Sequence, residues 1–224
     1  MERVTIMIRH SSNTNLHIYH DTTYAGMPIQ FDKGPFILEY LEALAATIRA
    51  ALNEYPRVFA FRVDLRLPAY GSLPHDAYTN AVIGRFLDSF KAKIKHNREM
   101  ARRASGYAHD SRVRYVWVRE VAGIGRPHYH LVILLNQDAF FTLGKIGSEN
   151  DNMRSRMDEA WASALGVSVE AVSGLVEVPD NPIYRVYRDN YESQQALFFR
   201  ASYLCKEATK VYGDRQHAFG CSRG

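Results

Sequence analysis

The sequence has 224 residues, of which 46% are hydrophobic and 12% aromatic, so it can bury the core of one domain and is not a disordered chain. Its formal net charge of +4 is concentrated: residues 85–119 hold ten lysines and arginines against three acids, and residues 200–224 hold five against two, which favours a polyanionic partner. The two cysteines lack the spacing of a disulfide framework, and no apolar run approaches the ~18 residues of a membrane span, so we expect a soluble cytoplasmic protein without a membrane partner.

The first part of the chain divides into an arm and the start of a domain. Residues 1–34 predict a short strand, RVTIMI, followed by an irregular polar arm, and residues 35–224 predict one globular domain. Within that domain, residues 35–52 carry apolar side chains at helical spacing, and Pro56 follows them. This pattern predicts a helix that packs against the core.

The next segment, residues 57–67, alternates between apolar and polar residues and predicts a strand. Its phenylalanine, valine and leucine side chains share one face. Arg62 and Asp64 share the other face, which we interpret as a possible active-site surface.

Residues 85–103 return to helical spacing and carry a basic stripe on the side away from the apolar residues. The stripe consists of Lys91, Lys95, Arg98 and Arg102, at steps of four, three and four. We predict that it contacts the backbone of a polyanion, which the resemblance described below identifies as DNA. A solvated helix face is the alternative explanation.

Residues 112–121 and 128–136 predict two strands of a hairpin, since two glycines and a proline lie between them. His128 and His130 point to the same face of their strand, roughly 7 Å apart at the Cα atoms. In an even register Glu120 faces the same way. Two imidazoles and one carboxylate with open positions indicate a catalytic divalent-metal site, for which we expect Mn²⁺ or Mg²⁺. Local hydrogen bonding at a strand end and an exposed hairpin carboxylate are the alternatives.

Three more elements complete the predicted order: a helix at residues 148–165, a short strand at 172–178 and a helix at about 191–211. Strands and helices in this order predict an α+β domain with a mainly antiparallel sheet.

The last predicted helix places Tyr203, Lys206 and Lys210 on one face, together with Phe199. A tyrosine can attack phosphorus, and a neighbouring ammonium offsets the charge that develops. We therefore predict that Tyr203 and Lys206 are catalytic, and that Lys210 and Arg126 contact DNA. A helical tyrosine that only packs is the alternative.

Taken in order, these motifs resemble those of the HUH endonucleases. His128-Tyr-His130 matches the paired-histidine motif, Tyr203-Leu-Cys-Lys206 looks like the Tyr-x-x-Lys motif of rolling-circle replication initiators, and Glu120 stands where that branch carries its third ligand. The strand Phe59–Leu67 and the segment Phe219–Arg223 look most like the replication proteins of filamentous phages and related prophage elements. The resemblance runs from about residue 57 to the end.

The resemblance implies a five-stranded antiparallel sheet with flanking helices. It also implies cleavage of single-stranded DNA at a replication origin in a bacterial cytoplasm, leaving a 5′-phosphotyrosine and a 3′-hydroxyl, and ligation by the reverse reaction. No phosphate-binding loop motif is present, so unwinding is expected from a host helicase, the host replication machinery or another chain. A relaxase or single-strand transposase would share this chemistry, and a non-enzymatic DNA-binding module would explain only the charge. A histidine-triad hydrolase is disfavoured because Val132 stands where its third histidine would be.

Overall fold

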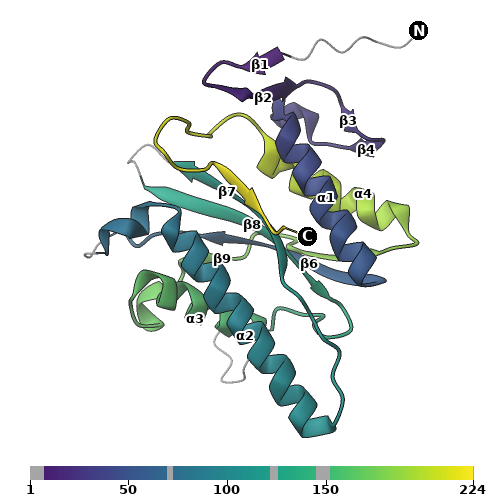
Figure 1. Cartoon of the computed structure of the whole chain (residues 1–224), viewed down its shortest axis with the longest axis vertical. Coiled ribbons are helices and arrows are strands. Elements are labelled where there is room, and N and C mark those ends of the chain that lie inside the picture. Colours follow the sequence, from purple (N-terminus) through teal and green to yellow (C-terminus); the bar gives the residue numbers. More distant parts are fainter. Residues whose placement is uncertain (1–7, 70–72, 122–125, 145–151, 224) are drawn as a thin grey trace.

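The computed structural model describes residues 8–69, 73–121, 126–144 and 152–223 (Figure 1). Its centre is an antiparallel sheet of six strands in which five follow the order β10–β6–β8–β7–β11, and the short β9 pairs with the end of β6. The strands are β6 (Arg57–Leu65), β7 (Arg114–Val121), β8 (Pro127–Asn136), β9 (Val176–Glu177), β10 (Ile183–Tyr187) and β11 (Phe219–Cys221). With helices on both faces, the predicted α+β class is confirmed.

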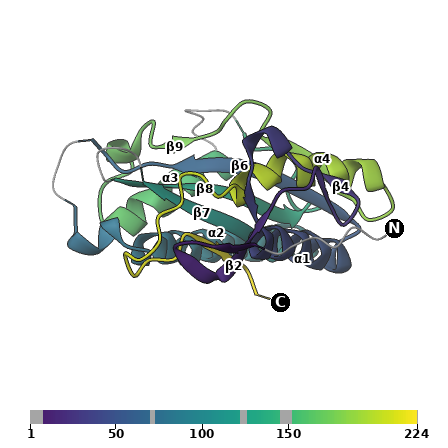
Figure 2. The same cartoon turned by 90° about the horizontal axis from the view of Figure 1, so that it is seen from above.

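Four α-helices cover the two faces of the sheet. α1 and α4 lie next to each other on one face, and α2 and α3 pack together on the other (Figures 1 and 2). The bounds are α1 (Leu38–Glu54), α2 (Ala81–Ser105), α3 (Met153–Leu165) and α4 (Tyr191–Ser202). Single-turn 3₁₀ helices add η1 (Phe31–Lys33), η2 (His75–Tyr78), η3 (Glu170–Val172) and η4 (Tyr203–Cys205).

Because successive side chains of a strand point to opposite faces, the core consists of two clusters, one on each face of the sheet. Odd-numbered residues of β6, such as Phe59 and Phe61, are fully buried against α2 and α3. Even-numbered residues, such as Val58 and Ala60, are buried against α1 and α4. Only the end of β6 carries polar residues on the second face, at Arg62 and Asp64, which is where the alternation predicted them.

The N-terminal arm is more ordered than the sequence predicts. The strands are β1 (Ile8–His10), β2 (Asn13–Tyr19), β3 (Thr23–Tyr24), β4 (Met27–Pro28) and β5 (Phe36–Ile37). The predicted irregular arm is therefore wrong for the polar stretch that forms β2, and the predicted strand at residues 3–8 lies outside the described residues except for its last residue. Leu16 and Ile29 are buried in the core beneath α1 and α4, so the arm packs into the same globular unit.

The final helix is shorter than the predicted 191–211, because α4 ends at Ser202. The Ser202 hydroxyl donates to the carbonyl of Phe199 and accepts the main-chain N–H of Gln30 from the arm. The Gln30 side chain also donates to the carbonyls of Phe199 and Arg200, which lack helical partners at this end. Contacts from the arm thus end the helix.

Three short strands, β9, β10 and β11, also differ from the prediction. The strand at 172–178 is reduced to the two residues of β9, preceded by η3. The strands β10 and β11, at the two ends of the five-strand path, were not predicted, because strands of five and three residues carry little periodic pattern. None of the helices in the described ranges is long and apolar enough to cross a membrane.

Gly220 in β11 lies against the indole of Trp117, and a Cβ atom there would approach the ring to 2.5 Å. We expect Gly220→Ala to lower the free energy of unfolding by about 1–3 kcal/mol, since the buried ring must move. Gly84→Ala in α2 is the control: nothing lies within 4 Å of its added Cβ, and it should be neutral or stabilise by about 0.5–1 kcal/mol. Urea denaturation of both variants measures the difference, and equal stabilities would contradict this packing.

Candidate active site

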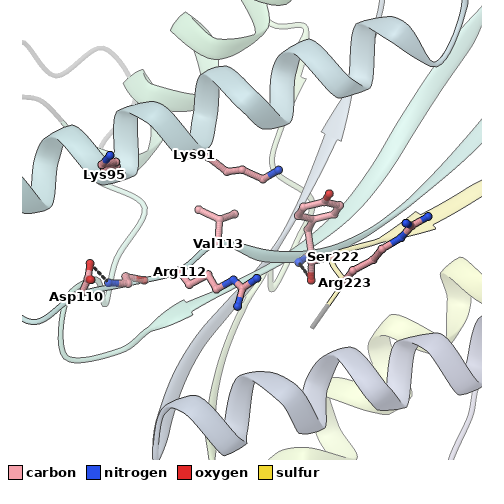
Figure 3. Close-up of a pocket in the computed structure, with 9 residues that line it drawn as sticks. Lys91, Lys95, Asp110, Arg112, Val113, Ser222 and Arg223 are labelled. Carbon is pink, nitrogen blue, oxygen red and sulfur yellow. Dashed lines mark hydrogen bonds between the residues drawn. The ribbon is translucent and has the colours of Figure 1, made fainter.

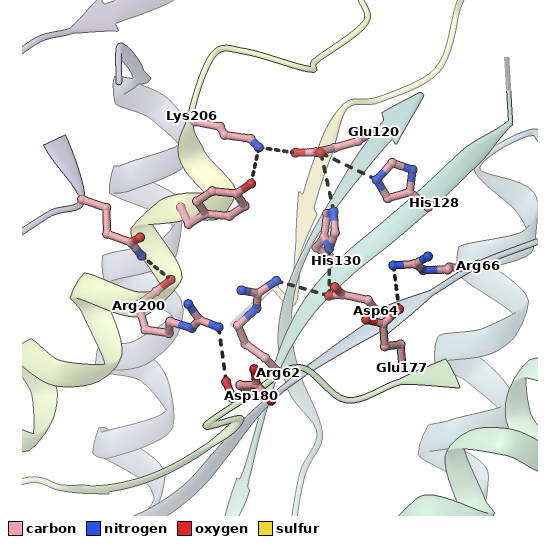
Figure 4. Close-up of polar contacts among 12 residues, drawn as sticks. Arg62, Asp64, Arg66, Glu120, His128, His130, Glu177, Asp180, Arg200 and Lys206 are labelled. Carbon is pink, nitrogen blue, oxygen red and sulfur yellow. Dashed lines mark hydrogen bonds and ion pairs between the residues drawn. The ribbon is translucent and has the colours of Figure 1, made fainter. Parts of the chain in front are cut away.

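The candidate site forms where β8 lies between β6 and β7. The register pairs Glu120 with His128 and Asp64 with His130. Because these residues are all even-numbered in their strands, the four side chains project from the same face, at one end of the three strands (Figure 4). The even register expected for the hairpin is confirmed, although residues 122–125 of the connection lie outside the described residues.

Glu120, His128 and His130 direct their donor atoms at one another. Oε2 of Glu120 lies 3.7 Å from Nε2 of His128 and 3.5 Å from Nε2 of His130, and one donor atom from each residue lies within 4.8 Å of the other two. Two imidazole nitrogens and a carboxylate oxygen at these separations can converge on one divalent cation. The predicted ligands are therefore brought together in a geometry that fits a metal.

Asp64 holds His130 from the side away from this centre. Its Oδ1 lies 2.8 Å from Nδ1 of His130 and 3.2 Å from a guanidinium nitrogen of Arg62. Burial alone would raise the pKa of Asp64, but the contacts with His130 and Arg62 outweigh it and lower the pKa. Burial opposes the protonated imidazole, yet the two carboxylates raise the pKa of His130. Asp64 thus fixes the ring with Nε2 facing Glu120, as carboxylates that support metal-bound histidines do.

The other carboxylate oxygen of Glu120 is held by two ammonium groups. Oε1 accepts a hydrogen bond of 2.9 Å from Lys210 and lies 3.5 Å from Nζ of Lys206. Burial would raise the pKa of Glu120, but the imidazoles and Lys210 hold it far below its ordinary value. Burial also lowers the pKa of Lys210, against the attraction of Glu120. The carboxylate therefore joins the imidazole pair to the C-terminal segment.

Tyr203 reaches this centre through Lys206. The Lys206 ammonium donates a hydrogen bond of 2.7 Å to the Tyr203 hydroxyl and lies 4.0 Å from the centre of its ring (Figure 4). The Arg62 guanidinium lies 5.9 Å from the same ring. The phenol is half-buried between two cations, and one ammonium contacts both the hydroxyl and Glu120.

Tyr203, Lys206 and Lys210 do not share a helix face, which corrects the predicted arrangement. Tyr203 begins η4, Lys206 follows that turn, and Thr209 has a φ of 73°, in the left-handed region that few non-glycine residues adopt. The chain then returns Lys210 inward, with its side chain fully buried against Glu120. Lys210 consequently does not lie on the surface as a DNA contact, and the predicted role needs correction.

The predicted basic stripe on α2 separates into two parts. Lys91 and Lys95 line a groove beside β7, whereas the guanidinium of Arg98 stacks over the ring of Phe140, 4.4 Å from its centre. Burial, followed by the charge of Arg156, lowers the pKa of Arg98. Arg102 is exposed near the end of the helix. Arg98 is thus largely engaged in packing.

Arg126 lies close to the imidazole pair. It donates a 2.6 Å hydrogen bond to the carbonyl of Pro68, and with Arg66 and both histidines it lines a cavity of about 310 Å³. The Arg66 guanidinium also pairs with Glu177 at 2.6 Å, so a phosphate bound beside the imidazoles would share or displace that pair. Arg66 was not predicted for this role, although it follows β6 and continues the alternation that places Arg62 and Asp64 on the polar face.

The chain is similar to known proteins over most of its length. A family model described as the YagK/YfjJ C-terminal domain matches residues 19–222. The uncharacterized protein YfjJ of Escherichia coli (strain K12) is 33% identical over 201 residues, which cover 85% of this chain and 97% of YfjJ. The uncharacterized protein YagK of the same strain is 33% identical over 198 residues, covering 85% of this chain and 95% of YagK. No solved structure matches the chain.

Asp64→Asn should weaken binding of Mn²⁺ by about 10–100-fold, because it removes the carboxylate that orients His130 while keeping the size of the side chain. His128→Ala, which removes a donor atom, should weaken it further. His20→Ala is the control, since this imidazole is exposed in the arm. Isothermal titration calorimetry with Mn²⁺ measures all three variants, and wild-type affinity in His128→Ala would contradict the metal site.

Proposed function

We propose that this chain, which belongs to the YagK/YfjJ C-terminal domain family, is an endonuclease of the HUH type that cleaves single-stranded DNA with Tyr203 as the nucleophile. The observation that carries the proposal is the shared ammonium of Lys206, which contacts the Tyr203 hydroxyl at 2.7 Å and Glu120 at 3.5 Å. A candidate nucleophile thus stands beside a candidate metal site, although the two come from distant parts of the sequence.

In the proposed reaction, the Tyr203 oxygen bonds to phosphorus as the bond from phosphorus to the 3′ oxygen breaks. The fragment downstream of the nick stays on the tyrosine through its 5′-phosphate, and the upstream fragment leaves with a free 3′-hydroxyl. The phenol loses one proton and the 3′ oxygen gains one, so the step is balanced and can run backwards as ligation. Lys206 would steady the charge on the phenolic and phosphate oxygens during attack.

Glu120, His128 and His130 would hold a divalent cation, Mn²⁺ or Mg²⁺, which supplies a Lewis acid for a phosphate oxygen. Arg66 and Arg126, beside the imidazole pair, would bind the neighbouring phosphates. Asp64 keeps the His130 ring in place throughout.

The biological setting that we propose is initiation of rolling-circle replication at an origin in a bacterial cytoplasm, with a host helicase to unwind the duplex. The resemblance of Tyr203-Leu-Cys-Lys206 to the initiator motif favours it over mobilisation or transposition, which would use the same chemistry. The close spacing of Tyr203, Lys206 and Glu120 favours an enzyme over a DNA-binding module, because binding alone requires no phenol at this position.

Tyr203→Phe should abolish the covalent adduct with a single-stranded oligonucleotide that carries the nick site, while affinity for that oligonucleotide stays unchanged. The variant keeps the ring between Arg62 and Lys206 and loses only the attacking oxygen. Tyr191→Phe is the matched control, because Tyr191 is 52% exposed at the start of α4. Mass spectrometry of the trapped adduct identifies the modified tyrosine. A nucleotide on any other tyrosine would overturn this nucleophile, and no adduct in the wild type would favour a binding module.

Lys206→Ala should slow adduct formation by about 10²–10³-fold without abolishing it, since it removes one donor at the developing charge. Its effect on DNA affinity should be small, because the Lys206 side chain is only 9% exposed. Lys206→Arg should recover part of the rate by restoring the positive charge. Single-turnover kinetics at saturating DNA gives these rates, and a wild-type rate in Lys206→Ala would rule out the role.

A further inference from the structure

A groove with a cavity of about 400 Å³ lies between α2 and the start of β7, on the other side of the sheet from the candidate active site (Figure 3). Tyr115 lines the groove, and it is five residues from Glu120 in β7 and therefore on the opposite face. Five residues of strand span roughly 16 Å. The groove is thus separate from the metal ligands.

Positive charge converges on this groove from three parts of the chain. Lys91 and Lys95 project from α2, Arg112 precedes β7, and Arg223 follows β11 (Figure 3). Asp110 is the one acidic residue among those lining the groove, and it accepts a hydrogen bond from a neighbouring main-chain N–H.

The ion pairs of the two lysines with residues outside the groove are long and exposed. Lys91 lies 3.5 Å from Asp88, and Lys95 lies 3.9 Å from Glu99. Pairs of this kind contribute about 0–1 kcal/mol in water, so an anionic ligand can displace or share them at little cost. Arg112 lies 3.4 Å from Glu54, a partly buried carboxylate that also pairs with Arg114. The residues that line the groove thus carry four cations against one acid.

An aromatic ring with a fixed backbone forms part of the groove wall. The main chain of Tyr115 is held on both sides by Ser222, whose N–H donates to the Tyr115 carbonyl and whose hydroxyl accepts the Tyr115 N–H. Nζ of Lys91 lies 5.3 Å from the centre of the Tyr115 ring. A ring between ammonium and guanidinium groups suits a ligand that has both a flat base and a phosphate.

We infer that this groove is a second binding site for single-stranded DNA, occupied by a segment away from the scissile phosphate. The inference rests on the proposed function for the identity of the strand. Lys91, Lys95, Arg112 and Arg223 contact its phosphates, and the Tyr115 ring stacks on a base. An acidic peptide would use the charges but would leave the ring without a planar partner.

The test compares two double variants that lose the same charge from the same helix. Lys91→Ala with Lys95→Ala removes two groove cations, and Arg102→Ala with Arg103→Ala removes two exposed cations outside it. Affinity for a fluorescent oligothymidylate, long enough to reach both sites, is measured against salt concentration. The groove variant should reduce the slope on logarithmic axes by about 1.4, at ~0.7 for each lost contact, and the control should change it little.

A third variant tests the stacking contact, and one further measurement separates this inference from the proposed function. Tyr115→Leu should weaken affinity without changing the salt slope, because it removes a ring but no charge. The double variant Lys91→Ala with Lys95→Ala should still form the adduct at saturating DNA. Equal slopes in the two double variants, or wild-type affinity in Tyr115→Leu, would overturn the second site whether or not Tyr203 forms an adduct.

Discussion

The buried carboxylate of Glu120 is the interaction on which the candidate site depends. One of its oxygens faces the imidazole pair, and the other accepts from Lys210 and lies near Lys206. Removing one partner from such a buried cluster typically costs about 3–5 kcal/mol, because the remaining charge is left uncompensated. The cluster also carries surplus positive charge, since Lys206, Lys210 and Arg62 outnumber the carboxylates of Glu120 and Asp64. A divalent cation would increase that surplus, so the candidate site favours an anionic ligand such as a phosphate group.

This arrangement exists because three strands keep one register. A slip of one residue between β7 and β8 would turn Glu120 away from His128 and would expose the residues that now form the core. Tyr129 lies between the two histidines in sequence, and its side chain points to the opposite face of the sheet, where it opposes such a slip. It is fully buried, its ring packs edge-on against Trp117, and its hydroxyl donates to the carbonyl of Thr79. The aromatic residue in the middle of the His-x-His motif therefore locks the strand that presents both imidazoles.

The sequence predicts the parts of the site that depend on local periodicity. Alternation alone places His128 and His130 on one face, and the assumption of an even hairpin register adds Glu120. It cannot predict that α4 ends at Ser202, because that end is determined by contacts with the distant arm. The proximity of Tyr203 and Lys206 was nonetheless predicted correctly from helical spacing, since residues three apart also lie on the same side of a 3₁₀ turn. Lys210 lies beyond that turn, where helical spacing no longer applies, and this is why its burial against Glu120 was not foreseen.

The end of α4 also explains what the N-terminal arm contributes to the site. A short 3₁₀ turn such as η4 has poorer hydrogen-bond geometry than an α-helix, so it cannot by itself hold a nucleophile in one orientation. The arm supplies external support on both sides of Tyr203: Gln30 bonds to the end of α4, and Phe36 forms a bridge with Lys206. The Glu207 N–H then donates at 2.8 Å to the carbonyl of Pro35, directly after the arm. The segment that carries the phenol is thus fixed by residues more than 160 positions earlier in the chain, and the arm is a structural part of the scaffold of the candidate site.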